Sequence, residues 1–289
     1  MKDIERNLNA LELLKEGKFA PAQALFIKNM KLCPDYNTYN NLGRFFVEFG
    51  RERKDGKVVS ANKVAFRYLK KSVELRPNIS AYRNLAYFSY ELYLYEKGSL
   101  DDAKIYQEEV LKLQCDSEDI YNYAVILYEL EKYNLGLEVL DKIVEDYHEA
   151  RFLYLLYLVK LNKLSNKTVN VYKEMIDGLD LFEQQYFYYC CQDYSRVISV
   201  TESFASCCLE VDEDSLAVYI DSLLMVSNAI QIKKQLNEIC KKLEVESKKI
   251  MDLLNNESKR KFQIKQYELK PTMEAVCGFC GCPMHNTAW

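Results

Sequence analysis

Three stretches of the chain repeat one pattern: YNTYNNLGRFFVEFG (residues 36–50), SAYRNLAYFSYELY (80–93) and EDIYNYAVILYELEKY (118–133). In each, a large apolar or aromatic residue precedes an apolar residue by three positions, and a small residue follows directly: Gly43, Ala86 and Ala124. Apolar residues spaced three and four apart share one face of a helix. A small residue on that face lets a second helix cross closely. The stretches therefore predict repeated helices that pack at their small residues.

A second apolar helix is predicted after each of these stretches, and it carries a small residue of its own. The small residues of the second helices are Ala22, Ala65, Ala103 and Gly136. The stretch LKEGKFAPAQALFIKNMKLCPD (14–35) adds a glycine between the two helices, two aromatic residues around the small one, and a closing proline: Gly17, Phe19, Phe26 and Pro34. Residue by residue this resembles the tetratricopeptide repeat family, whose unit is a helical hairpin of roughly 34 residues.

The resemblance implies an all-α fold, a right-handed α-solenoid of helical hairpins. Four clear hairpins are expected at residues 4–35, 36–79, 80–116 and 117–147, and a degenerate fifth at 148–180. The expected organisation is therefore helical repeats over 1–180, a helical C-terminal capping region over 181–255, a linker or frayed helix end over 256–276, and a flexible cysteine-rich tail over 277–289. Within the capping region, apolar residues spaced from Ile232 to Leu253 predict one amphipathic helix with Glu246 on its apolar seam.

Composition narrows the classes of function. The chain has 289 residues, 49% of them hydrophobic and 28% charged, with a formal net charge of -4. This balance is typical of a folded protein and gives no reason to expect a nucleic-acid or membrane partner. Ten cysteines without a visible secretion signal indicate a reducing compartment, so a cytoplasmic location is expected. No phosphate-binding loop, paired-histidine motif or nucleophile elbow is found, and no catalytic residue is predicted: the chain is not expected to be an enzyme.

The family resemblance implies that the inner face of the solenoid holds an extended peptide. Positions on the first helices that lie off the small-residue stripe are the candidates for this groove: Asn40, Arg44, Arg83, Tyr87 and Asn122. Asparagine and arginine side chains bind peptide backbone and carboxylate groups. The leading prediction is thus a non-catalytic scaffold or adaptor that binds a protein or peptide partner.

A second candidate surface is the locally basic stretch 51–71. Its cations are Arg51, Arg53, Lys54, Lys57, Lys63, Arg67, Lys70 and Lys71. The first interpretation is a solvated charged edge of the solenoid, and the alternative is a docking strip for an acidic partner.

The chain ends in CGFCGCPMHNTAW (277–289), which combines thiols with a histidine. Cys277, Cys280, Cys282 and His285 form a candidate Cys3His zinc set, although the spacing is not that of a common zinc module. The tail also resembles the modified core of ribosomally made peptide natural products. The alternative function is therefore a precursor or carrier whose C-terminal peptide is the substrate of a peptide-modifying enzyme. A tail without a role is the third interpretation, and beyond zinc no cofactor is expected.

Overall fold

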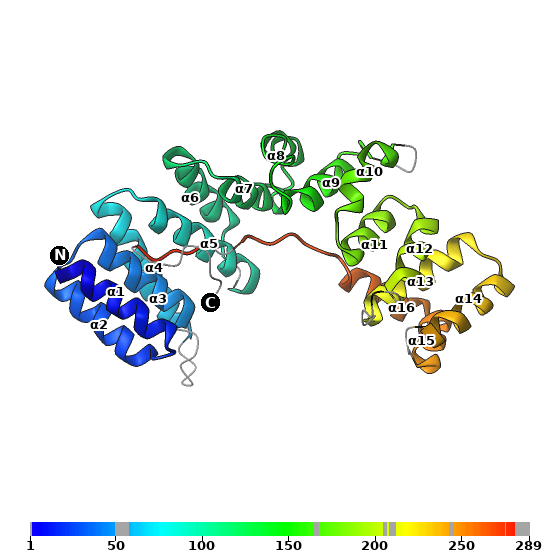
Figure 1. Ribbon diagram of the computed structural model, residues 1–289, viewed down its shortest axis with the longest axis horizontal. Helices are drawn as coiled ribbons and strands as arrows, with labels where there is room; N and C mark the ends of the chain where they lie inside the picture. Colours follow the sequence, from blue (N-terminus) through cyan, green and yellow to red (C-terminus); the bar gives the residue numbers. More distant parts are fainter. Residues whose placement is uncertain are drawn as a thin grey trace. The chain divides into compact units, whose positions relative to one another are not determined.

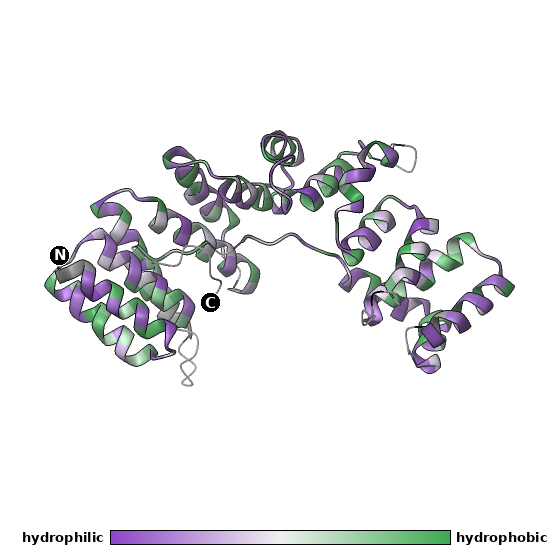
Figure 2. Cartoon of the chain, viewed as in Figure 1, coloured by the Kyte–Doolittle hydropathy of each residue, from purple (hydrophilic) through white to green (hydrophobic). Residues whose placement is uncertain are grey.

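The structure is a computed structural model, and it describes residues 2–49, 58–96, 98–164, 168–204, 207, 212–242, 246–274 and 276–280. Over these residues the secondary structure is helical and contains no strand (Figure 1). The chain divides into two compact units: unit 1 is Met1–Lys132 with Thr272–Trp289, and unit 2 is Tyr133–Pro271. Helices in both units carry hydrophobic and hydrophilic residues side by side, as amphipathic helices do (Figure 2).

Unit 1 is a row of antiparallel helix pairs. Its helices are α1 (Lys2–Lys15), α2 (Phe19–Leu32), α3 (Tyr36–Phe49), α4 (Val58–Leu75), α5 (Ile79–Glu96), α6 (Leu100–Leu113) and α7 (Ser117–Glu129). The partners α1 and α2, α3 and α4, and α5 and α6 pack against each other, and α2 packs on α3, α4 on α5 and α6 on α7. These helices begin and end within two residues of the expected hairpin bounds or inside them, and the prediction of an all-α solenoid is confirmed. Residues 51–57 of the basic stretch lie outside the described residues.

The small residues lie where the helices cross. A Cβ on Gly43 would meet the Leu69 side chain of α4 at 2.7 Å and the Leu69 backbone nitrogen at 3.1 Å. Ala65 and Ala86 are fully buried. Gly17 joins α1 to α2 with a φ of +70°, a left-handed conformation that favours glycine. The repeated small residues thus set how closely the helices of unit 1 approach.

Unit 2 is also helical. Its helices are α8 (Tyr133–Leu140), α9 (Ala150–Lys160), α10 (Lys173–Asp177) after the 3-10 turn Val169–Tyr172, α11 (Leu181–Cys190), α12 (Tyr194–Phe204), α13 (Glu213–Val226), α14 (Ala229–Lys242), α15 (Ser247–Asn255) and α16 (Glu257–Gln266). Helix α13 is central to this unit, since α11, α12, α15 and α16 all pack on it. Its Tyr219 and Ile220 are fully buried in the core of the unit.

Four expectations about organisation differ from the structure. The division falls between Lys132 and Tyr133, not after residue 180. The expected single helix around Glu246 is two helices, because Glu246 is the N-cap residue of α15. Residues 257–266, expected as a linker or frayed end, form α16, whose buried Arg260 donates to Asp221 at 3.1 Å. Residues 277–280, expected to begin a flexible tail, pack in unit 1.

Among the described residues, we find no helix with the length and apolar character needed to span a membrane.

Candidate peptide-binding groove

An extended stretch near the C-terminus lies against α3, α5 and α7 of unit 1, each of which begins a hairpin of the repeat. We call residues 272–280 the docked segment; Ala275 within it lies outside the described residues. The stretch, red in Figure 1, has neither helix nor strand along its described residues up to the turn at Cys280. Its backbone polar groups therefore need partners from elsewhere, and side-chain amides on α3, α5 and α7 supply them.

Asn41 of α3 and Asn122 of α7 each close a ring with the backbone of one residue. The N–H of Cys280 donates to Asn41 Oδ1 at 2.7 Å, and Asn41 Nδ2 donates to the Cys280 carbonyl at 3.2 Å. The N–H of Glu274 donates to Asn122 Oδ1 at 2.7 Å, and Asn122 Nδ2 donates to the Glu274 carbonyl at 3.2 Å. Each amide offers one donor and one acceptor to a single residue, as a neighbouring β-strand would. These contacts involve only the backbone atoms of the bound residue, so they do not depend on its side chain.

Asn40 of α3 and Asn84 of α5 converge on the backbone carbonyl of Gly278. Asn40 Nδ2 donates to it at 2.7 Å and Asn84 Nδ2 at 2.8 Å, and Asn84 Nδ2 also donates to Asn40 Oδ1 at 2.8 Å. Both side chains are buried. A Cβ on Gly278 would collide with the Asn84 amide. The groove therefore has no room for a side chain at this position.

The next residue, Phe279, fills an apolar pocket between α1, α2 and α3. Its side chain is 2% exposed and packs in a cluster with Leu11, Leu42 and Phe45. Its ring stacks on Phe26, with centroids 6.2 Å apart and an interplanar angle of 10°. Burying an aromatic ring is the largest apolar contribution that a single residue makes to such a contact. At residues 278 and 279 the groove is thus selective for the side chain as well as the backbone.

Cys280 sits at the end of the docked segment as a neutral thiol. Asn40 Nδ2 lies 3.2 Å from its Sγ and donates to it. Burial raises the pKa of the Cys280 thiol to about 11, against the opposing effect of hydrogen bonds from Ser80 and Asn40. The thiolate is the form that reacts and binds metal, so docking disfavours that form of Cys280.

The predicted zinc set is only partly within the described chain. Cys277 packs against the apolar cluster around Phe279, whereas Cys282 and His285 lie outside the described residues. In the part of the chain that the structure describes, no three histidine, cysteine or acidic side chains come together as a metal site would need. The zinc set, and with it the modification of the tail, stays a prediction.

The other predicted groove residues lie beside the docked segment. Arg44, Arg83 and Tyr87 line one small cavity together with Met273 and Val276 of the segment. The Arg44 guanidinium pairs with Glu48 and lies 5.5 Å from the centre of the Tyr87 ring.

Arg83 is engaged within the scaffold. Its guanidinium binds both carboxylate oxygens of Asp119 on α7, at 2.8 and 2.5 Å, and Asp116 at 2.9 Å. It therefore ties α5 to α7. Its predicted contact with a ligand stays a prediction, as does that of Arg44.

Two asparagines of the groove were missed by the sequence reasoning. Asn41 and Asn84 stand two positions before the small residues Gly43 and Ala86, as Asn122 stands two positions before Ala124. The repeat register therefore places one asparagine per hairpin at the same point of the inner face. Candidates for the groove were chosen from the sequence because they lie off the small-residue stripe. This criterion selected Asn40 next to Asn41, and Arg83 next to Asn84.

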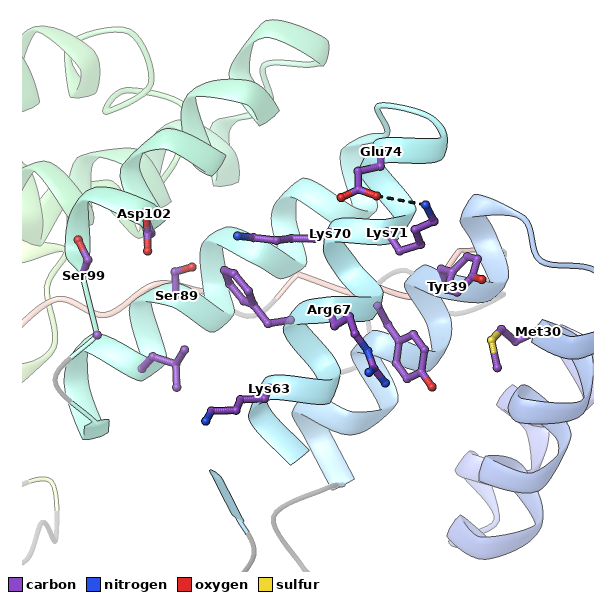
Figure 3. A pocket seen from close by; sticks show the side chains of 14 residues that line it. Met30, Tyr39, Lys63, Arg67, Lys70, Lys71, Glu74, Ser89, Ser99 and Asp102 are labelled. Atoms are coloured by element: carbon purple, nitrogen blue, oxygen red, sulfur yellow. Dashed lines mark hydrogen bonds and ion pairs between the residues drawn. The ribbon is translucent and has the colours of Figure 1, made fainter. Parts of the chain in front are cut away.

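A second hollow, of about 850 Å³, lies over α4 in unit 1 (Figure 3). Lys63, Arg67 and Lys70 line it from one side of α4, and Asp102 of α6 faces it. Lys70 Nζ lies 4.5 Å from the centre of the Phe66 ring, a cation–π contact. These cations belong to the basic stretch of the sequence, and an acidic partner for them stays a prediction.

No protein-family model matches the sequence, and a search of curated proteins gives no significant match. Among solved structures, the chain is similar to a tetratricopeptide repeat protein from Parabacteroides merdae, with 15% identity and a TM-score of 0.58 over 88% of this chain and 98% of that one. It also matches PilF of Pseudomonas aeruginosa, with 12% identity and a TM-score of 0.45 over 88% and 97% of the two chains. The first likeness confirms the tetratricopeptide-repeat fold expected from the sequence.

Proposed function

We propose that the chain is a non-catalytic scaffold that binds an extended peptide of a protein partner in the groove formed by Asn40, Asn41, Asn84 and Asn122, which we call the asparagine groove. The observation that carries the proposal is the pair of rings that Asn41 and Asn122 close with single backbone residues. Every peptide presents such N–H and carbonyl groups, so this surface suits an extended chain rather than a folded one.

The burial of the four amides supports the same function. Their exposed fractions are between 0% and 3%. These fractions hold with the docked segment in place, and the partners of the amides there are backbone groups of an extended chain. The four amides can therefore satisfy the backbone of a bound peptide. The fold agrees, because a repeat solenoid presents a long surface made of equivalent positions.

Selection of displayed random peptides on the full chain tests the proposal. The expected result is enrichment of peptides whose binding falls by about tenfold or more when Asn84 and Asn122 are both replaced by alanine, because one backbone hydrogen bond of Asn84 and two of Asn122 are lost, each contributing on the order of 1 kcal/mol. The matched control is Asn255→Ala, which removes an exposed asparagine from unit 2. Enriched peptides that bind the double variant as well as the wild type, or a selection without enrichment on any form of the chain, would refute a peptide-binding asparagine groove.

A further inference from the structure

We infer that the docked segment is a built-in ligand of the asparagine groove, and that the partner which displaces it is an extended peptide carrying a glycine followed by an aromatic residue. This rests on the proposed function and specifies both the chemistry of the partner and the regulation of the groove.

The first step is that the docked segment is held as a ligand. Its backbone is bound at Glu274, Gly278 and Cys280 by side chains of α7, α5 and α3, respectively. Meanwhile the helix pairs of unit 1 pack on one another through their own apolar faces. The segment thus adds an extended stretch of backbone to a surface that is formed by the packed helices.

The second step is that the groove specifies glycine at one position. The Gly278 carbonyl accepts from Asn40 and Asn84 at 2.7 and 2.8 Å, which brings the backbone directly against the Asn84 amide. Because a Cβ there would collide with that amide, any other residue must give up these hydrogen bonds. A peptide in the same position needs a glycine for the same reason.

The third step is that the following position specifies an aromatic ring. The Phe279 ring belongs to an apolar cluster with Leu11, Leu42 and Phe45 and is stacked on Phe26. Burying a charged or polar side chain there would leave it without a hydrogen-bond partner. A small aliphatic side chain would leave part of the pocket empty. A glycine–aromatic pair is therefore the side-chain signature of the groove.

The fourth step is competition. The docked segment belongs to the same chain as the groove, with residues 133–271 between them, and a tethered ligand acts at an effective concentration set by the length and stiffness of its connection. A peptide with the same contacts, added in solution, must overcome this advantage. The free chain is therefore closed to weak ligands and opens to a partner that supplies more contacts than the docked segment does.

The test uses a fluorescein-labelled synthetic peptide, KPTMEAVCGFC, which copies residues 270–280. Its binding is measured by fluorescence anisotropy, under reducing conditions, on the full wild-type chain and on the full chain with Gly278→Ala and Phe279→Ala. We expect the double variant to bind the peptide at least about tenfold more tightly, because its own segment no longer competes. A peptide with alanine in place of the glycine should bind the double variant at least about tenfold less tightly than the original peptide does.

The matched control is the full chain with Gly178→Ala and Phe262→Ala in unit 2. A Cβ on Gly178 would lie 3.2 Å from the flexible end of the Arg151 side chain and at ordinary contact distance from backbone of its own turn, so alanine fits there. Phe262 is 61% exposed. This control should bind the labelled peptide as the wild type does. Adding Asn84→Ala to the Gly278→Ala, Phe279→Ala chain should remove the gained affinity, which shows that the peptide occupies the asparagine groove.

A measurement on the wild-type chain alone covers the case in which the double variant fails to fold. The unlabelled peptide KPTMEAVSGFS, which has no thiol, is added in increasing amounts while alkylation of Cys280 is followed by mass spectrometry. We expect alkylation to accelerate as the peptide displaces the docked segment. The analogue with alanine in place of glycine should have no effect.

The outcomes separate this inference from the proposed function. Equal affinity of the labelled peptide for wild type and double variant, lost with Asn84→Ala, would show a peptide-binding groove that the segment does not occupy. Failure of the peptide to bind either chain would overturn the inference, while the display selection still decides the proposed function. A wild-type chain that is dimeric where the double variant is monomeric would place the segment in the groove of a second copy and overturn the intramolecular arrangement.

Discussion

The two compact units hold neighbouring parts of the chain by different chemistry. In unit 2, Tyr267 is 5% exposed, and its hydroxyl donates to Gln185 Oε1 at 2.5 Å. In unit 1, asparagine amides bind the backbone of residues 274–280. A hydroxyl on a phenol ring is a group that only tyrosine brings, whereas every residue except proline brings both a backbone N–H and a carbonyl. The contact in unit 2 thus depends on one tyrosine side chain, whereas the asparagine contacts of unit 1 bind backbone, and side chains are selected there at positions 278 and 279.

The contact between Tyr267 and Gln185 in unit 2 belongs to a buried hydrogen-bond network. Gln185 Nε2 donates to Thr201 at 2.5 Å, and Gln185 Oε1 accepts from Ser215 at 2.6 Å as well as from Tyr267. Gln185 and Thr201 are fully buried. Every member of such a network depends on the others. Removing a member of this network should therefore damage the fold, whereas removing an asparagine of the groove should release only the docked segment.

The largest expected effect is that of Tyr267→Ala. Loss of a buried aromatic ring leaves a cavity and costs about 3–5 kcal/mol, and Gln185 also loses a partner. Urea unfolding followed by circular dichroism should show this loss in the stability of unit 2. The control Phe262→Ala, at a side chain that is 61% exposed, should stay within about 0.5 kcal/mol of wild type. If both variants unfold like the wild type, Tyr267 is not part of the core of unit 2.

The next effect is overpacking at the helix crossings of unit 1. Ala86→Leu introduces a larger side chain at a fully buried position and should cost about 1–3 kcal/mol. Gly43→Leu should cost a similar amount, because even its Cβ meets Leu69 at 2.7 Å. Ala20→Leu, at an exposed position of α2, is the control for the change in helix composition. Thermal melts that do not distinguish Ala86→Leu from Ala20→Leu would contradict the repeat register.

These substitutions test what the sequence predicts best. Gly43 and Ala86 are local signals, because each belongs to a helix whose periodicity is visible within about 15 residues. Asn122 was predicted for the groove from its place on such a helix, and Asn41 and Asn84 follow from the same register. Local periodicity therefore carries most of the information on the fold and on one wall of the groove.

What the sequence did not predict is contact between distant positions. Asn122 and Glu274 are 152 residues apart, and Asn40 and Gly278 are 238 apart. No period links such pairs, so the docked segment looked like a polar linker followed by a flexible tail. Helix α16 was missed for a related reason: its sequence ESKRKFQIKQ is polar, and its burial depends on Arg260 pairing with Asp221.

A smaller effect comes from removing one amide in each unit. Gln185→Ala removes the acceptor of the buried Ser215 hydroxyl and one partner each of Thr201 and Tyr267, so it should lower the stability of unit 2 by about 1–3 kcal/mol. Asn122→Ala removes the ring with Glu274, so it should change the stability of the helices by only about 0.5 kcal/mol. It should instead raise the hydrogen-exchange rate of the Glu274 amide. Equal destabilisation by the two variants would mean that the asparagine groove is part of the core and not a ligand site.

The smallest effect concerns the titration of single thiols and leaves the helices unchanged. Burial raises the pKa of Cys280 in unit 1 and of Cys190 in unit 2 to about 11 each. Docking favours the protonated thiol of Cys280, so its contribution to docking is full below the ordinary thiol pKa of about 8.5 and is lost as the pH rises through about 11. Alkylation rates between pH 7 and pH 10, resolved by peptide mass spectrometry, report the thiolate of each cysteine.

Gly278→Ala should change the titration of Cys280 and leave that of Cys190 unchanged. It should release the docked segment and return the alkylation profile of Cys280 to the ordinary thiol range, while Cys190, half-buried by the fold of unit 2, keeps its raised pKa. Exposed Cys115 serves as the reference for the reagent, and Gly178→Ala as the control for the substitution. Since a shift of two pKa units changes the thiolate fraction by about 100-fold at most, the rates at pH 8 should differ clearly between Gly278→Ala and the wild type for Cys280 alone. A Cys280 profile that does not respond to Gly278→Ala would show that its burial is independent of the glycine contact with Asn84.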